Sequence, residues 1–360
     1  MSDHWEEFHQ RIGTWQRTGD TERLRLVEFY EESFRYRETV PERKLELLTR
    51  ARDEAKRLGE PWWVLFFEYN RLSTLTADLH DFARALPVAV ELLVRFSGPE
   101  GRTHAHRSDV HTLGLYAFLQ VDPIGYRREL EDGFAYLNAQ IPQGPGTARY
   151  VLDYRRAEYL GESERWEEAL ELSYRSLAVT EQHRDPMAKA WEGAWILFRL
   201  CGVCDALGRF DRLALHAEDM RERSQPRSDL LRTRASASIW LAVASRVSGD
   251  ERAASRAYRQ GTRELEGLDS RDEICADALA RYHELGGDLE AALGVRDREL
   301  AVVARKGMLH RACRVEIERC RLLSRASALT PADVGKAKEA TAKMRVPDWY
   351  LERLARIGTA

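Results

Sequence analysis

The sequence holds few of the features that mark secreted, membrane-bound or disulfide-linked proteins. Its 360 residues include five cysteines, an odd number without a framework spacing, which argues against a disulfide-linked extracellular domain. No run approaches the roughly 18 consecutive apolar residues of a membrane-spanning helix. The first residues are acidic and lack the basic and then apolar pattern of a signal peptide. These absences predict a cytoplasmic protein with no membrane segment.

Motifs of catalysis and cofactor binding are also missing. Neither a Gly-x-x-x-x-Gly-Lys-Ser/Thr loop, nor a Gly-x-Gly-x-x-Gly loop, nor a Gly-x-Ser-x-Gly elbow occurs. Cys201 and Cys204 form a Cys-x-x-Cys pair deep inside a predicted helix, where core packing explains them better than redox chemistry. His104, His106 and His111 open another predicted helix, where solvated histidines are a simpler explanation than a metal site. The sequence therefore predicts no enzyme, no catalytic residue, no cofactor and no metal.

Charge, by contrast, is abundant and uneven. Charged residues make up 32% of the chain, and only 7 of its 56 basic residues are lysines. Solvated helix faces explain most of this charge, and the alternative is that arginine forks bind carboxylate or phosphate partners. Residues 301–360 carry 13 basic and 6 acidic groups, a net charge of +7. Because aromatic residues do not alternate with these arginines, docking to an acidic protein surface is favoured over nucleic-acid binding.

A repeat organises the chain. Helix-length apolar patterns break at short turns that recur 42, 39, 47, 41, 37 and 41 residues apart. A period of this size, with two helical stretches in each period, predicts a solenoid of helical hairpins. Sustained alternation with a period of two is missing, so no strands are expected. The turns are centred on His80, Asp122, Gly161, Gly208, Gly249, Gly286 and Ser327.

Helix boundaries are marked by proline at the start and by glycine at the end. We expect one domain, 1–360, in which 1–20 is an N-terminal capping helix, 21–346 holds the hairpins and 347–360 is a C-terminal capping helix. Prolines that open predicted helices are Pro41, Pro61, Pro123, Pro186, Pro331 and Pro347. The eight predicted hairpins are 21–39 with 41–58, 61–79 with 81–96, 104–120 with 123–140, 147–161 with 165–184, 186–207 with 210–224, 227–248 with 251–268, 270–286 with 289–306, and 308–328 with 331–344.

Several of these turns resemble the turn of the tetratricopeptide repeat. Ala157–Leu170 and Ser248–Ala254 carry small residues around the turn, and Gly208 followed by Phe210 matches the family's order of a small and then an aromatic residue. The period of about 40 departs from the family's 34 residues, and the 104–140 hairpin has almost no motif. The resemblance implies an all-α, right-handed α-solenoid of about eight antiparallel hairpins, a tetratricopeptide-like superhelix. In such a fold the first helix of each repeat lines a concave groove.

Helix 186–207 carries two apolar stripes, and its own hairpin partner buries only one of them. The resemblance places the other stripe, Trp191, Trp195 and Phe198, in the groove as aromatic anchors. The alternative is that these rings pack between adjacent first helices. The predicted partner-binding residues are Trp62, Phe66, Asn70, Arg155, Glu158, Trp191, Trp195, Phe198, Asp205, Ile239, Val243, Arg246 and His283.

The predicted function is non-catalytic binding of a protein or peptide in the groove, as a scaffold or adaptor. The alternative is a ligand- or peptide-sensing module that controls a partner protein. Arg155, Asp205 and Arg246 would orient the partner. Some proteins of this family clamp a C-terminal carboxylate with lysines and asparagines, but only Asn70 fits that pattern here. The identity of the partner and a homo-oligomeric state both remain open.

Overall fold

A computed structural model describes most of the chain, and its elements are helices. Among the described residues no strand occurs, which confirms the predicted all-α hairpin fold. Contacts between Cα atoms divide the chain into two compact units. Unit 1 comprises 1–121, 128–140 and 306–308, and unit 2 comprises 122–127, 141–305 and 309–360. The single domain over 1–360 stays a prediction. The described residues are 3–36, 40–142, 144, 146–225, 228–266 and 273–357.

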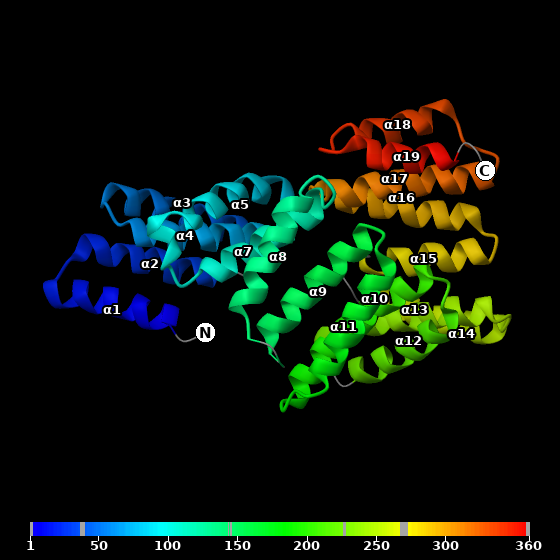
Figure 1. The fold of residues 1–360 in the computed structure, drawn as a ribbon, viewed down its shortest axis with the longest axis horizontal. Helices are drawn as coiled ribbons and strands as arrows, with labels where there is room; N and C mark the ends of the chain where they lie inside the picture. Colours follow the sequence, from blue (N-terminus) through cyan, green and yellow to red (C-terminus); the bar gives the residue numbers. More distant parts are fainter. Residues whose placement is uncertain are drawn as a thin grey trace. The chain divides into compact units, whose positions relative to one another are not determined.

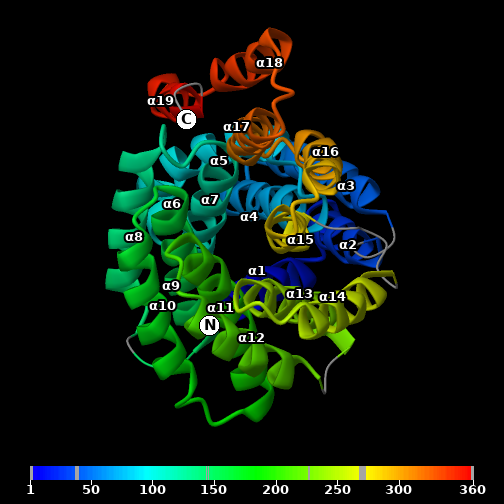
Figure 2. The same ribbon diagram turned by 90° about the vertical axis from the view of Figure 1, so that its right-hand side faces the viewer.

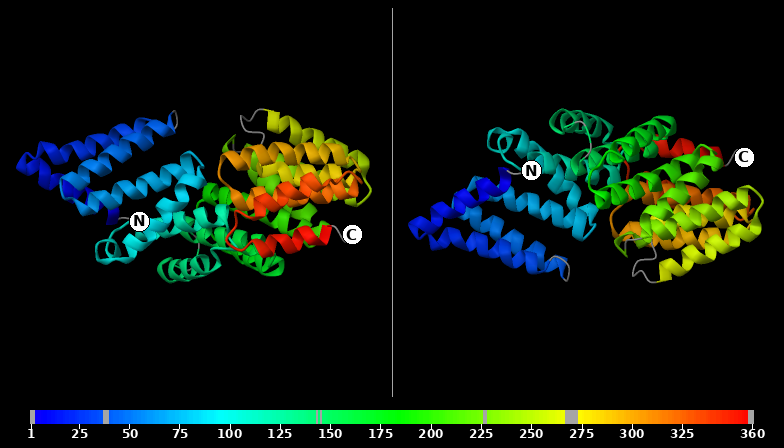
Figure 3. Two further views of the ribbon diagram at one scale, coloured as in Figure 1. Left: turned by 90° about the horizontal axis from the view of Figure 1, so that it is seen from above. Right: turned by 90° about the horizontal axis from the view of Figure 1, so that it is seen from below.

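Unit 1 packs its helices in chain order around an aromatic core. Figure 3 shows α2 to α5, in blue and cyan, lying side by side, and α7 packs on α5. Trp63 and Phe67 are fully buried at the centre of this core, against Phe8 and Trp15 of α1. The elements are α1 (Asp3–Thr18), α2 (Thr21–Arg35), α3 (Pro41–Arg57), α4 (Pro61–Ser73), a π-helical turn (Thr74–Asp78), α5 (Phe82–Ser97), α6 (Pro99–Arg102), α7 (Arg107–Val121) and α8 (Arg127–Gln140).

Unit 2 contains five successive helical pairs and a closing helix. Each pair packs within itself, and α15, α16 and α17 lie side by side (Figure 1). The closing helix packs on α17 next to α18 (Figure 2). The elements are α9 (Thr147–Glu162), α10 (Trp166–Thr180), α11 (Pro186–Ala206), α12 (Phe210–Ser224), a 3₁₀ turn (Ser228–Leu230), α13 (Leu231–Val247), α14 (Glu251–Glu266), α15 (Glu273–Leu285), α16 (Leu289–Arg305), α17 (Leu309–Arg325), α18 (Pro331–Thr341) and α19 (Pro347–Ile357).

The turns follow the predicted repeat closely. Gly208 and Gly249 have φ angles of 67° and 83°, the left-handed conformation that a glycine adopts without steric cost. Gly161 is an exception, because α9 continues through it to Glu162 and Glu164 takes the left-handed position, with φ 59°. Its predicted place at a helix end is therefore wrong.

Five of the six predicted proline starts begin a helix, and the sixth does not. Pro41, Pro61, Pro186, Pro331 and Pro347 each occupy the first position of a helix. Pro123 instead lies in a turn, since the Asp122 carboxylate accepts a hydrogen bond from the backbone N–H of Gly125 at 2.9 Å. This turn delays the start of α8 to Arg127.

Helices α13 and α14 approach closely at Gly261, which gives a test of the packing. A Cβ atom at this position would lie 2.9 Å from the Ala235 carbonyl oxygen and 2.6 Å from a side-chain carbon of Ile239. We expect Gly261→Ala to destabilise unit 2 by about 1–3 kcal/mol, because the backbone of α13 has to shift. Gly335→Ala in α18 is the control, since a Cβ there meets nothing within 4 Å. Urea unfolding followed by circular dichroism compares the two variants, and equal midpoints would contradict the close approach.

Candidate functional site

Unit 2 contains a groove with a volume of about 360 Å³. The first helix of every pair, α9, α11, α13, α15 and α17, contributes to its lining. Trp166 of α10 and Arg296 of α16 are the lining residues that come from second helices. The groove thus lies along the face on which first helices meet.

Part of the groove lining is apolar. Trp166, Phe198 and Trp240 line it, and Phe198 packs edge-on against Trp195 with ring centroids 5.8 Å apart. Gly202 of α11 also lines the groove, and no atom lies within 4 Å of where its Cβ would be. The absence of a side chain leaves room beside the aromatic rings. This part of the groove can accept an apolar group of a ligand.

Much of the remaining lining is charged, and its charges are closely balanced. It contains six arginines and five carboxylates. At one end Glu284, which is buried, accepts hydrogen bonds from Arg321 at 2.5 and 2.9 Å and also pairs with Arg325. The arginines are Arg199, Arg281, Arg296, Arg311, Arg314 and Arg321, and the carboxylates are Glu162, Asp205, Asp277, Glu284 and Glu318.

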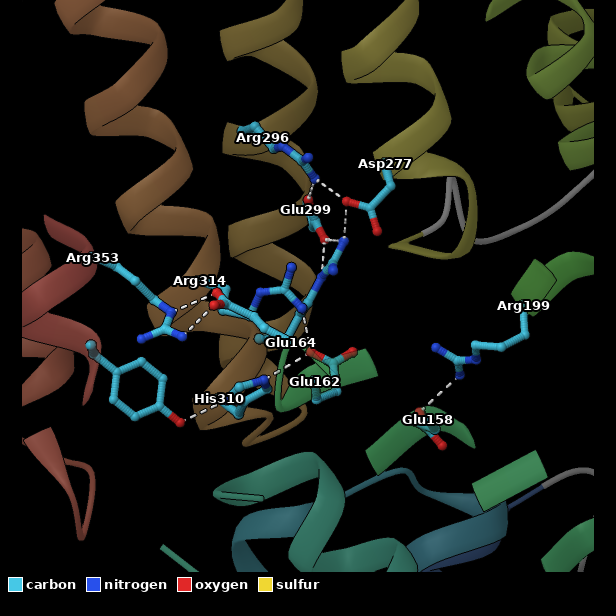
Figure 4. A network of polar contacts seen from close by, with 12 residues as sticks. Glu158, Glu162, Glu164, Arg199, Asp277, Arg296, Glu299, His310, Arg314 and Arg353 are labelled. Carbon is cyan, nitrogen blue, oxygen red and sulfur yellow. Dashed lines mark hydrogen bonds and ion pairs between the residues drawn. The ribbon is translucent and has the colours of Figure 1, made fainter. Parts of the chain in front are cut away.

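An ion cluster centred on the buried Glu299 lies between α15, α16 and α17 (Figure 4). The side chain of Glu299 has no exposed surface and contacts Arg296 at 2.6 Å and Arg311 at 2.5 Å. Asp277 contacts the same two arginines, each at 2.8 Å. The two carboxylates together compensate two guanidinium groups that are largely removed from water. This cluster fixes the three helices relative to one another.

Beside this cluster, a chain of side chains begins at the groove. Arg314 pairs with Glu162, the last residue of α9, and His310 Nε2 lies 2.9 Å from the same carboxylate (Figure 4). His310 Nδ1 lies 2.7 Å from the hydroxyl oxygen of Tyr350 in α19. That oxygen is 3.3 Å from the Asp122 carboxylate. Groups from four parts of unit 2 are therefore connected through one imidazole.

The surroundings set the charges of the groove carboxylates. Burial opposes the ionisation of Glu162, but the charge of Arg314 and the hydrogen bond from His310 outweigh it and hold its pKa well below the usual range. Burial raises the pKa of Asp205, with the charge of Arg281 opposing. Glu162 is thus firmly ionised, whereas the charge of Asp205 is less well compensated. A cationic group of a ligand would gain most beside Asp205.

The thirteen predicted partner-binding residues are divided between the two units. Trp62, Phe66 and Asn70 belong to unit 1 and are buried. Phe66 stacks on Trp62, and the side-chain amide of Asn70 donates to the Phe66 carbonyl oxygen at 2.8 Å. The other ten residues belong to unit 2. The sequence pattern does not reveal this division, because it marks a buried face without showing which helices share a core.

Within unit 2, Phe198 and Asp205 line the groove. Trp195 packs on Phe198, and Trp191 contacts Trp195 with ring centroids 6.5 Å apart. The ion pair of Arg155 and Glu158, at 2.8 Å, continues to the groove residue Arg199, at 3.3 Å from Glu158. Their roles in binding a partner stay predictions.

Four further predicted residues point elsewhere. Ile239 and Val243 are fully buried in the core of unit 2, so their predicted place on an open groove surface is wrong: the matching helix face packs inward. Arg246 lies over the Tyr282 ring, 3.8 Å from its centroid, and donates to the Tyr282 carbonyl oxygen. His283 hydrogen-bonds to the Tyr258 hydroxyl at 3.0 Å. Neither lines the groove.

Most of the charged groove residues were not predicted from the sequence. Arg281 and Glu284 of α15, and Arg314, Glu318 and Arg321 of α17, recur three, four or seven residues apart. This spacing places them on one helix face, so the signal was present for both helices. Glu162 had no such signal, because it lies 152 residues from Arg314.

Several arginines of the basic segment 301–360 form ion pairs inside unit 2. They pair with carboxylates from residues 162–318 at distances down to 2.5 Å. A patch whose charges are already paired attracts polyanions only weakly. These pairs compensate part of the net charge of +7. The pairs are Arg311 with Asp277 and Glu299, Arg314 with Glu162, Arg319 with Asp297 and Glu316, Arg321 with Glu284 and Glu318, and Arg353 with Glu164.

Two kinds of feature are absent from the residues that the structure describes. No helix there is both long enough and apolar enough to cross a lipid bilayer. No cluster of three or more histidine, cysteine, aspartate or glutamate side chains placed to hold a metal ion occurs there either.

Comparison with known proteins gives matches at the level of structure. No protein-family model and no curated protein matches the sequence. The solved structure of Rap protein complexed with competence and sporulation factor matches over 81% of this chain and 80% of its own, with 13% identity and a TM-score of 0.53. PlcR of Bacillus thuringiensis, solved with the peptide PapR7 and DNA, matches over 78% of this chain and 98% of its own, with 14% identity and a TM-score of 0.42. Rap is a tetratricopeptide-like helical repeat protein, and this chain has the same fold.

Proposed function

We propose that unit 2 binds a short peptide in its groove without catalysing a reaction, and that the protein acts as an adaptor or scaffold through this contact. The observation that carries the proposal is the groove itself, in which an apolar floor lies beside both arginines and carboxylates. Its volume of about 360 Å³ is at the lower end of the range for ligand sites, which suits a few residues of a peptide. Rap, the solved neighbour with the same fold, was crystallised with a bound factor.

The balance of charge favours a ligand that carries both signs. Arg281, Arg314 and Arg321 are 31%, 30% and 37% exposed, so carboxylate and carbonyl oxygens of a ligand can reach them, and Asp205 is 20% exposed. A ligand with charge of only one sign would pair with one member of a protein ion pair and leave the other member uncompensated. A peptide with an amino and a carboxyl terminus can replace the partners of both. Phe198 and Trp240 offer apolar contacts to its side chains.

The test is an affinity selection from a pool of synthetic pentapeptides with unmodified termini. We expect the pool to yield binders of the wild type, and Arg321→Ala to weaken the best one roughly tenfold, about 1.4 kcal/mol. Arg325 still pairs with Glu284 in that variant, so the loss reports on the ligand rather than on the fold. Arg175→Ala, in exposed α10 surface with its side chain 67% exposed, is the matched control. A pool without any binder would refute the proposal.

A regulatory role is the second candidate, because the chain of side chains from Arg314 to Asp122 connects the groove with the turn that follows α7. In that role a bound peptide changes the conformation and so controls a partner protein. Small-angle scattering with and without the selected pentapeptide tests it. A radius of gyration that does not change would favour the adaptor.

We further propose that the protein works in the cytoplasm. All five of its cysteines are buried thiols in the structure, and burial raises the pKa of the Cys204 thiol to about 11. Such thiols are inert in the reducing interior of a cell. Fractionation of the source cells, with detection of the protein by antibody, tests this location; recovery in a membrane or secreted fraction would contradict it.

A further inference from the structure

The chain of interacting side chains that starts at Arg314 in the groove connects an accessible site with a buried one. Arg314 lines the groove and its side chain is 30% exposed, whereas the next members are progressively less accessible. His310 and Tyr350 are buried, and so is Asp122. The chain therefore leads from a surface that a ligand reaches to a site that it does not reach.

This chain of side chains has two hydrogen-bonding states, which differ in the protonation of His310. A neutral imidazole has one N–H group and one acceptor nitrogen. Since Glu162 is an anion, the N–H of a neutral His310 lies on Nε2 and donates to Glu162, and Nδ1 then accepts the hydroxyl proton of Tyr350. The hydroxyl has only that proton, so Asp122 receives none from Tyr350 in this state.

Protonation of His310 changes the direction of the last bond. An imidazolium has two N–H groups, so Nδ1–H donates to the Tyr350 oxygen while Nε2–H still donates to Glu162. The Tyr350 hydroxyl is then released to donate to Asp122. In this second state each of the three contacts has one donor and one acceptor.

We infer that Arg314 is a subsite for a ligand carboxylate, and that its occupation favours the imidazolium form of His310 and thereby turns the Tyr350 hydroxyl towards Asp122. A ligand carboxylate on Arg314 adds a negative charge beside the imidazole and competes with Glu162 for the guanidinium. Glu162 then depends more on His310 for compensation. The inference rests on the proposed function for its ligand, but the two states of the chain exist without one.

The charges that face His310 come from every helix packed around it. Glu162 reaches it from α9, Arg314 from its own helix α17, and Asp122 from the turn before α8, with the phenol of Tyr350 between. Burial lowers the pKa of His310, Glu162 opposes that effect, and the charge of Arg314 adds to it. Compensation of Arg314 by a ligand therefore raises the pKa of His310. Because the bound state then holds the proton more tightly, ligand affinity rises as the pH falls.

Asp122 connects this switch to two backbone segments. Its carboxylate accepts hydrogen bonds from the backbone N–H of Gly125 at 2.9 Å and of Arg345 at 2.7 Å. Gly125 lies in the turn after α7, and Arg345 lies between α18 and α19. A hydrogen bond from the Tyr350 hydroxyl adds a third donor to this carboxylate and so restrains the group that holds both segments. Occupation of the groove is thus expected to tighten the turn at which the chain passes from unit 1 into unit 2.

The first experiment needs no ligand. Arg314→Ala removes the cation as an occupied subsite would, and the titration of the His310 ring is followed by NMR of histidine-labelled protein, with the signal assigned through His310→Gln. We expect the midpoint to move to higher pH than in the wild type, and to lower pH in Glu162→Gln. Arg353→Ala is the matched control, because Arg353 pairs with Glu164 at the same end of α9 and leaves the midpoint unchanged. An unchanged or lower midpoint in Arg314→Ala would overturn the inference.

A readout at the far end separates the switch from simple packing. Below the His310 midpoint, the protection factors of the Gly125 and Arg345 amide hydrogens should be higher than above it. A protection factor is corrected for the base-catalysed intrinsic exchange rate, which itself falls with the pH. Tyr350→Phe, which keeps the ring and removes the hydroxyl, should abolish this dependence while the protein stays folded by circular dichroism. Dependence that survives in Tyr350→Phe would show that the signal does not pass through the hydroxyl.

The second experiment uses the best pentapeptide without His, Asp or Glu side chains from the selection described above. Calorimetry in buffers of different ionisation enthalpy should show proton uptake on binding below about pH 7, where the amino terminus of the peptide is already protonated. Affinity should rise as the pH falls from about 7 to about 5. The same peptide with a C-terminal amide should show neither effect. Binding without proton uptake would overturn the inference and leave the proposed function intact. Failure of every pentapeptide would refute the proposed function, and the NMR titration would still decide on the switch.

Discussion

Replacement of Glu299 by alanine is expected to destabilise unit 2 by about 3–5 kcal/mol. The carboxylate is fully buried and is shared by Arg296 and Arg311, which have side-chain exposures of 10% and 16%. Its removal leaves Asp277 to compensate two guanidinium groups that water does not reach freely. An uncompensated buried charge costs far more than the loss of an exposed pair. Urea unfolding followed by circular dichroism at 222 nm measures the effect.

An exposed pair of the same chemistry is the control for this experiment. Glu168 pairs with Arg165 at 2.6 Å, but its side chain is 56% exposed. We expect Glu168→Ala to cost less than about 1 kcal/mol. Similar losses in the two variants would mean that water compensates the arginines around Glu299, and the cluster would then have no special weight in the stability of the helices.

Replacement of Trp63 by alanine is expected to destabilise unit 1 by about 3–5 kcal/mol. Trp63 is among the largest side chains in the protein with no exposed surface, and its ring contacts Phe8 and Trp15 at centroid distances of 5.2 and 5.1 Å. Because these rings belong to α1, the cavity also removes the packing that holds the first helix. Hydrogen exchange followed by mass spectrometry shows whether the protection lost is that of α1 to α4.

Trp191→Ala is the comparison for this variant, because it removes the same side chain from a position in unit 2 that is only partly buried. A smaller loss of stability is expected, confined to the helices around α11. If Trp191→Ala were the more damaging change, the assignment of Trp63 to the centre of a core would be contradicted. The two variants together also show whether each unit keeps its protection when the other loses it.

The sequence predicts the elements well because their boundaries are set locally. Proline at a first helical position and glycine in a left-handed turn act within a few residues, which is why the starts at Pro186 and Pro331 and the turns at Gly208 and Gly249 were all foreseen. The predicted helix start at Pro123 was wrong for a local reason that the sequence pattern did not show. The side chain of Asp122 bonds to Gly125 and forms a turn instead of capping a helix.

The candidate site was predicted only in part, because its contacts join distant residues. Phe198 and Asp205 could be found from the stripes of one helix, and the structure places both in the groove. The partner of Arg314 is a glutamate 152 residues away, and no local spacing reports such a pair. The spacing of Ile239 and Val243 identified an apolar face of α13 but not what that face packs against. In the structure it is buried in the core of unit 2.

The path of the chain between the units limits how the gene can be shortened. Residues 122–127 cluster with unit 2 although α7 and α8 on either side belong almost entirely to unit 1, and residues 306–308 cluster with unit 1 although both neighbouring helices belong to unit 2. Within unit 1 the Lys306 carbonyl oxygen accepts a hydrogen bond from the backbone N–H of Phe82 at 2.8 Å, the start of α5. No single cut of the coding sequence therefore yields both units complete. Truncation after α8 would remove Lys306 and so the hydrogen-bond partner of the first residue of α5. In a series of deletions chosen by length alone, a loss of function could therefore not be distinguished from misfolding of unit 1.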